Sequence, residues 1–242
     1  MQNFLVQYYS DTADRVKEEQ AEDARLRESK VRRRGVDQES HAPVTPPVAI
    51  PREILVDTLP EEAEEVAERD RGIGEAFRAD ILAVVGDRKV KAIVCTHAHN
   101  DHVNAAAQVA EATGAPILVH PDEAPLWRMT YPDRAPDGAL AHGQVITVAG
   151  TDLTVLHTPG HAPGACCLHA PDLGVVFTGD TLFQGGPGAT GRSYSDFPTI
   201  VESIRDTLLT LPSETVVHTG HGDDTTIAAE APHVQEWLDR GH

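Results

Sequence analysis

The sequence predicts an α/β fold. Three observations support this class: a length of 242 residues, strand-like apolar runs that alternate with helical patterns in the first half, and closely spaced strand-like runs from residue 144 onward. The length suits one large α/β domain or two small ones. With 40% hydrophobic residues, the chain can bury a core without disulfides.

The first 50 residues have a different character from the rest. The stretch RVKEEQAEDARLRESKVRRR reads as a polar helix with few apolar positions, and HAPVTPPVAIP is Pro-rich and extended. We therefore divide the chain into an atypical N-terminal segment, residues 1–50, and a folded domain, residues 51–242. EILVD (53–57) opens that domain as a short strand, and a helical pattern follows over residues 60–87.

The central and C-terminal elements follow from apolar runs and their stop signals. VKAIVCT (90–96) predicts a buried strand, and the helix VNAAAQVAEATG ends at Gly114. Residues 121–140 are expected to form a long loop, and residues 195–211 a helix. Further strands are expected at 116–120, 144–149, 152–158, 164–170, 174–180 and 214–217.

The stretch THAHNDH (96–102) directly follows the first buried strand. The end of such a strand lies at a sheet edge, where clefts form, so alternate residues can point into one pocket. Imidazoles at His97 and His99 suit zinc or iron, and Asp101 and His102 can face a second ion. The chain has 13 histidines, so a histidine-rich surface turn is the competing interpretation.

Three more strand ends carry histidine or aspartate: HTPGHAPG (157–164), FTGDTLF (177–183) and HTGHGDD (218–224). A fold can assemble a rigid site from such separated positions. In this order, the four motifs resemble the metallo-β-lactamase superfamily, and within it the glyoxalase II-like hydrolases. The resemblance covers about residues 90–230 and implies a four-layer αββα sandwich with two metals at one edge. It implies a first metal held by His97, His99 and His161, a second held by Asp101, His102 and His221, and Asp180 bridging both.

The resemblance also implies a reaction. We expect a dinuclear zinc hydrolase of a small-molecule thioester, in which a metal-bridging hydroxide attacks the acyl carbon and Asp101 is the catalytic carboxylate that holds the nucleophile. A thiolate can leave without a strong general acid because its pKa is about 8.5. The alternatives are a mononuclear iron (Fe²⁺) persulfide dioxygenase that uses His97, His161 and Asp180, a lactonase, and a binding protein without activity.

Substrate contacts are predicted at two places. Arg192, in a loop that partly resembles a GRTD-like stretch of the family, either binds an anionic substrate group or pairs with Asp196 to fix the loop. Trp127 and Tyr131 form either a lid over the cleft or a packed insertion. The helical domain with which glyoxalase II grips glutathione has no counterpart after His221, so the thiol carrier stays open.

Composition restricts the partners. A formal net charge of −18 opposes binding to phosphate backbones, so no nucleic acid partner is expected. The sequence has no apolar segment long enough to predict a membrane span or a signal peptide. The three cysteines lie in apolar runs, which predicts buried thiols and a reducing cytoplasm. Self-association into a homo-oligomer stays open.

Overall fold

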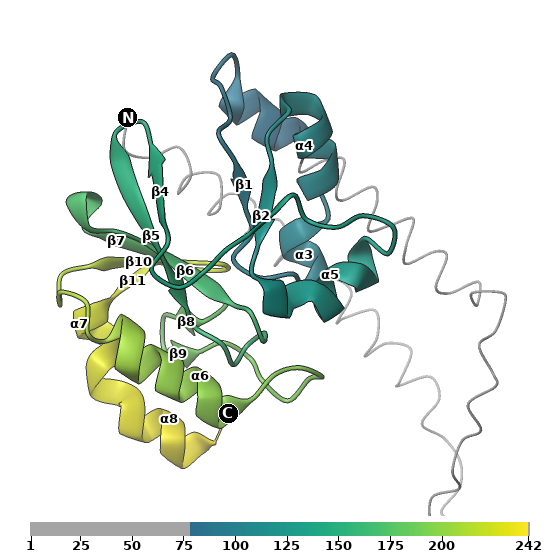
Figure 1. Ribbon diagram of the computed structural model, residues 1–242. Helices are drawn as coiled ribbons and strands as arrows, with labels where there is room; N and C mark the ends of the chain where they lie inside the picture. Colours follow the sequence, from purple (N-terminus) through teal and green to yellow (C-terminus); the bar gives the residue numbers. More distant parts are fainter. Residues whose placement is uncertain (1–77, 242) are drawn as a thin grey trace, which may run out of the picture.

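The computed structural model describes residues 78–241 (Figure 1). The predicted polar helix and Pro-rich segment of residues 1–50 and the strand at 53–57 lie outside the described residues. Of the helical pattern predicted over 60–87, the described part is helical from residue 78 to residue 85.

The larger sheet has six strands in the order β11-β10-β7-β6-β5-β4. Neighbouring strands are antiparallel except β10 and β7, which run parallel, so the loops after both of these strands lie at the same edge. The strands are β4 (Val145–Val148), β5 (Thr151–His157), β6 (Cys166–Ala170), β7 (Val175–Gly179), β10 (Val216–Thr219) and β11 (Thr225–Thr226).

A smaller sheet of three parallel strands faces the larger one (Figure 1). Its strands are β1 (Ile93–Val94), β2 (Ile117–Val119) and β3 (Gly138–Ala139). A separate hairpin pairs β8 (Leu182–Phe183) with β9 (Gly186–Pro187).

Helices cover the outer face of each sheet. Beside the smaller sheet are α3 (Asn100–Val103), α4 (Ala106–Thr113) and α5 (Ala124–Thr130), the last preceded by the 3-10 turn η1 (Pro121–Glu123). Beside the larger sheet are α6 (Phe197–Ser203), the π-helical turn η3 (Ile204–Leu208), α7 (Ile227–Glu230), the 3-10 turn η4 (Ala231–His233) and α8 (Val234–Arg240). The 3-10 turn η2 (Pro171–Leu173) joins β6 and β7.

The expectation of a loop over residues 121–140 was wrong, because this stretch contains η1 and α5. His120 caps η1 through its side chain, and Pro121 stands in the first turn. Pro125 likewise stands in the first turn of α5, where a proline costs no hydrogen bond. These prolines and acidic residues, read as loop formers, are helix-start signals here.

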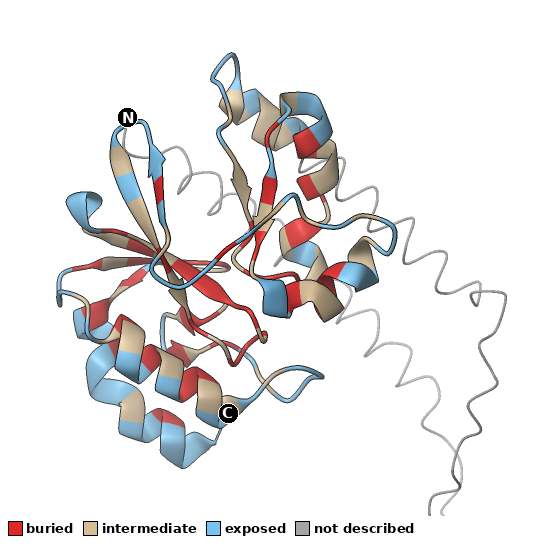
Figure 2. Ribbon diagram, in the orientation of Figure 1, coloured by how far each residue is buried: buried red, intermediate tan, exposed pale blue. Residues whose placement is uncertain are grey.

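Three hydrophobic clusters show the four layers. One packs α3, α4 and α5 onto the smaller sheet, and another packs α6, α7 and α8 onto the larger sheet. The third lies between the sheets, where Val94 and Leu118 meet Ile146, Val155 and Cys166. Figure 2 shows the buried residues concentrated along these contacts. The predicted αββα sandwich is therefore confirmed, as is the burial of all three cysteines.

Within residues 78–241, no helix combines the length and the apolar character that crossing a bilayer would require.

Candidate metal centre

Three histidines from two loops form what we call the first group: His97, His99 and His161. The first two follow β1, and the third follows β5. The His99 Nδ1 and His161 Nε2 atoms lie 2.9 Å apart. The other ring nitrogen of His161, Nδ1, is 2.8 Å from the carbonyl oxygen of Ala189, which holds the hydrogen on Nδ1 and leaves Nε2 free to face the centre.

Asp101, His102 and His221 form the second group. Asp101 and His102 belong to the first turn of α3, and His221 follows β10. The Nε2 atoms of His102 and His221 are 3.0 Å apart, and His221 Nε2 is 3.2 Å from Asp101 Oδ2. Helix α3 thus places one carboxylate and one imidazole opposite the loop after β10.

Asp180 lies between the two groups, directly after β7. Its Oδ1 is 3.3 Å from His102 Nε2, and its Oδ2 is 3.6 Å from His161 Nε2. Gly220 makes room for this carboxylate, because a Cβ at position 220 would lie 2.1 Å from Asp180 Oδ1. Asp180 is therefore placed to contact ligands of either group.

Burial controls the protonation of the first group. Burial lowers the pKa of His97 well below its usual value, and the neighbouring histidines lower it further. Burial, and then the neighbouring His161, lowers the pKa of His99 to about 4. Burial also lowers the pKa of His161. These three imidazoles are consequently neutral near pH 7, the form that binds metal.

The second group and Asp180 respond to opposite charges. Burial would lower the pKa of His102, but the Asp180 carboxylate outweighs it and the pKa is raised. Burial would raise the pKa of Asp180 and Asp101, yet both are lowered, by His102 at Asp180 and by the hydrogen bond from His221 at Asp101. Both carboxylates therefore stay ionised near neutral pH.

The donor set fits a bound metal. Within residues 78–241, the buried His97 Nε2 finds no hydrogen-bond partner, and the buried Asp180 Oδ1 has only the ion-pair distance of 3.3 Å to His102 Nε2. A buried polar atom without a partner costs about 1–3 kcal/mol, so such atoms call for an explanation such as an ion. Imidazole nitrogens with carboxylate oxygens suit zinc and iron.

The chain also matches a known protein family. The family model of the metallo-β-lactamase superfamily matches residues 52–221. The chain belongs to this superfamily. It is a hydrolase of a superfamily whose fold binds metals. Three of the four motifs that suggested the resemblance lie in the matched region, and the match ends at His221, within the fourth.

Relatives and solved structures support the membership. The hydroxyacylglutathione hydrolase GloC of Haemophilus influenzae is 33% identical over 170 residues, which cover 65% of this chain and 80% of that protein. The structure of TTHA1623 in a di-iron-bound form is 35% identical, with a TM-score of 0.54 over 62% of this chain and 80% of that one. ETHE1 from Myxococcus xanthus is 29% identical, with a TM-score of 0.55 over 66% of this chain and 68% of that one. The expected likeness to glyoxalase II-like members is confirmed.

Trp127 and Tyr131, the two aromatic residues predicted to contact substrate, both pack against the core. Trp127 is 1% exposed within the core, and its Nε1 donates to the carbonyl oxygen of Arg134. The Tyr131 hydroxyl donates to the carbonyl oxygen of Val103 and packs against the same cluster. These contacts favour the packed-insertion interpretation, and a substrate role for Trp127 and Tyr131 stays a prediction.

Arg192 lies in the exposed loop before α6. The expected pairing with Asp196 does not form among the described residues, because the Asp196 carboxylate instead accepts hydrogen bonds from the backbone and side chain of Thr199 at the start of α6. A substrate role for Arg192 stays a prediction.

Other histidines lie outside the two groups. His218 Nδ1 is 2.8 Å from Asp224 Oδ2, so it supports the loop that carries His221. His157 stacks on His120 with ring centroids 4.0 Å apart and planes 12° from parallel, close to Asp122. In parallel rings the nitrogen lone pairs do not converge on one point. The His120–His157 pair with Asp122 therefore lacks the converging donor atoms of the first and second groups.

One residue beside the centre went unnoticed in the sequence. Glu123 is fully buried, and its carboxylate contacts the backbone next to both loops of the first group. It belongs to no motif. The only sequence signal for its role is a glutamate between two prolines that mark helix starts, in the stretch that we expected to be a loop.

Proposed function

We propose that the chain hydrolyses a small-molecule thioester at two divalent metal ions, most simply zinc. The first group would hold one ion and the second group the other, with Asp180 contacting both. The observation that carries the proposal is the second group: Asp101, His102 and His221 converge within 3.5 Å of one another, a set that a single-metal enzyme does not need. The hydroxyacylglutathione hydrolase GloC is a relative whose name describes cleavage of such an acyl–thiol bond.

The bound ions would supply an activated water and polarise the acyl carbonyl. The chain's own contribution is to hold the donors rigidly and to accept a proton. Asp101 is the residue we assign to holding the nucleophile and taking its proton, because its carboxylate is half exposed beside the second group and its lowered pKa keeps it ionised near neutral pH. No second acid is required, since a thiolate with a pKa of about 8.5 is an adequate leaving group.

A lactonase would use the same residues with a different leaving group. An iron enzyme that oxidises persulfides is the other candidate, because the 35% identical structure in a di-iron-bound form is a similar protein that holds iron. In that reaction His97, His161 and Asp180 would hold a single iron.

The first experiment is metal stoichiometry by elemental mass spectrometry on full-length protein purified without added metal. We expect about two zinc ions per chain, together with hydrolysis of acyl thioesters that chelation abolishes. About one iron per chain, with oxygen consumption on a persulfide, would overturn the proposal in favour of the dioxygenase. Zinc-loaded protein that cleaves lactones and leaves thioesters intact would reassign the substrate.

A further inference from the structure

Glu123 is a carboxylate in a place where carboxylates are rare. It ends η1, between β2 and α5, and its exposed fraction is 0%. Acidic side chains are almost never fully buried unless they are paired. Among residues 78–241, no arginine, lysine or histidine forms an ion pair with it, so its partners must be of another kind.

Those partners are two backbone amides. The Ala98 N–H donates to Glu123 Oε2 at 2.6 Å, and the Gly164 N–H donates to Oε1 at 2.7 Å. Distances this short are typical of charge-assisted hydrogen bonds. One carboxylate therefore joins two chain segments that are far apart in sequence.

Both segments carry ligands of the first group. Ala98 lies between His97 and His99, and Gly164 belongs to the loop that carries His161. Glu123 thus bonds to each loop at the backbone, and among residues 78–241 no hydrogen bond or ion pair joins its carboxylate to an imidazole. Since these two loops together make the first group, the carboxylate sets their separation.

The packing around Gly164 shows how closely Glu123 approaches. A Cβ at position 164 would lie 2.9 Å from Glu123 Cγ and 2.9 Å from its backbone nitrogen. Only a glycine leaves this space. Burial raises the pKa of the Glu123 carboxyl, and the two amide donors oppose that rise.

We propose that Glu123 is a positioning residue that fixes the first group for metal binding by holding the His97–His99 segment and the His161 loop together. The proposal goes beyond the reaction but rests on the proposed function in one respect, namely that the first group binds metal. Its test reads metal affinity and needs no substrate.

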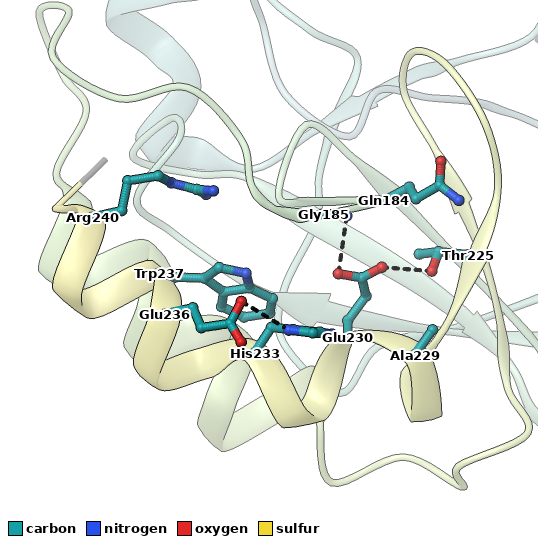
Figure 3. Close-up of a pocket in the computed structure, with 9 residues that line it drawn as sticks. All are labelled: Gln184, Gly185, Thr225, Ala229, Glu230, His233, Glu236, Trp237 and Arg240. Atoms are coloured by element: carbon teal, nitrogen blue, oxygen red, sulfur yellow. Dashed lines mark hydrogen bonds and ion pairs between the residues drawn. The ribbon is translucent and has the colours of Figure 1, made fainter.

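The chain offers a matched control in Glu230. This second buried glutamate is 3% exposed and also accepts two hydrogen bonds, from the Gly185 N–H at 3.1 Å and the Thr225 hydroxyl at 2.6 Å (Figure 3). It lines a cavity of about 390 Å³ beside α8, together with Trp237 and Arg240, and none of the seven ligand candidates lines that cavity. Substitution of Glu230 therefore measures how much stability and zinc affinity change when a buried carboxylate away from the centre is removed.

The experiment compares Glu123→Gln with Glu230→Gln in the full chain. In Glu123→Gln the amide can accept through only one atom, so one of the two backbone N–H donors loses its partner. In Glu230→Gln the amide oxygen can still accept from the Gly185 N–H and the amide NH2 can donate to the Thr225 hydroxyl, so this variant mainly removes the buried charge. We measure the thermal midpoint of each metal-free variant, and zinc affinity by competition with a chromophoric chelator. Repeating the titration in a His221→Ala background isolates the first group.

We expect both variants to lower the thermal midpoint, and only Glu123→Gln to weaken zinc binding at the first group, by about tenfold or more, as lost supporting contacts around metal ligands typically do. Equal zinc affinity in the two variants would overturn the proposal and leave Glu123 a packing residue. If Glu123→Gln does not fold, Gly164→Ala tests the same contact by pushing the loop off an intact carboxylate. Unchanged affinity in folded Gly164→Ala would also overturn it. Wild-type protein that binds two zinc ions without cleaving thioesters would instead contradict the proposed function, and leave this test valid.

Discussion

The first and second groups use similar donors in different surroundings. The first consists of imidazoles alone and is nearly closed to solvent, with the His161 side chain 9% exposed. The second contains a carboxylate and opens outward, with the Asp101 side chain 51% exposed. If both groups bind metal as we propose, the difference separates two tasks: the first group would retain an ion, and the second would receive the substrate.

The supporting contacts differ in the same direction. In the first group, the Glu123 carboxylate accepts from the backbone N–H groups of Ala98 and Gly164, and the Ala189 carbonyl oxygen lies 2.8 Å from His161 Nδ1. The second group has the aromatic ring of Phe183, from the β8–β9 hairpin, stacked 6.5 Å from the His221 ring. An ion in the second group would therefore have less protein around it. The following four experiments use that asymmetry.

Asp180→Ala should disrupt both groups at once, since this residue contacts both. We expect loss of both ions and a fall in turnover greater than the roughly 100-fold that loss of a supporting contact can cause. Zinc content and thioester hydrolysis measure the result. A metal-replete and fully active variant would contradict the whole assignment.

Single deletions should separate the groups. His97→Ala should abolish high-affinity zinc binding at the buried group, whereas His221→Ala should leave one tightly held ion, because the first group then stays intact. Elemental analysis after gel filtration gives the counts. If His221→Ala loses both ions while staying folded, the groups are not separable and the asymmetry is wrong.

Acid should empty the second group first. The pKa values of the first-group histidines are lowered, that of His99 to about 4, so protons begin to compete for that imidazole only near that pH. The pKa of His102 is raised, so a proton must be displaced there already at mildly acidic pH. Zinc content measured after dialysis from pH 7.5 downward should pass through a plateau of about one ion below pH ~6.5, the ordinary pKa of histidine. Loss of both ions in a single step would contradict this.

The smallest effect is expected at the solvent side. Arg192→Ala removes an exposed charge that has no ion pair among the described residues, so zinc content and stability should stay within about 0.5 kcal/mol of wild type. If Arg192 binds an anionic substrate group, KM should rise several-fold with kcat unchanged. Arg205→Ala, which removes an exposed arginine on η3 paired with Asp206, is the control. An equal KM for both variants would remove Arg192 from the substrate site.

The sequence predicts ligand candidates better than their surroundings. Residues such as His97 and Asp180 stand at strand ends in short motifs, and strand ends are readable from apolar runs. Glu123 and Trp127 have no such signature, because their roles depend on which backbone lies opposite them in three dimensions. A buried glutamate that accepts amides and a tryptophan that fills a core look, in one dimension, like any surface glutamate and any exposed aromatic.

Gly220 carries a consequence for how this chain can change over evolution. Because any side chain there would occupy the place of the Asp180 carboxylate, the position should accept almost no replacement in a saturation library, although it has no reactive group. Gly150 and Gly174, unlike Gly220, have backbone conformations that favour glycine, but nothing lies within 4 Å of the Cβ that each lacks, so they should tolerate asparagine. A descendant that acquired alanine at position 220 would keep every histidine and aspartate of the two groups and have lost its centre.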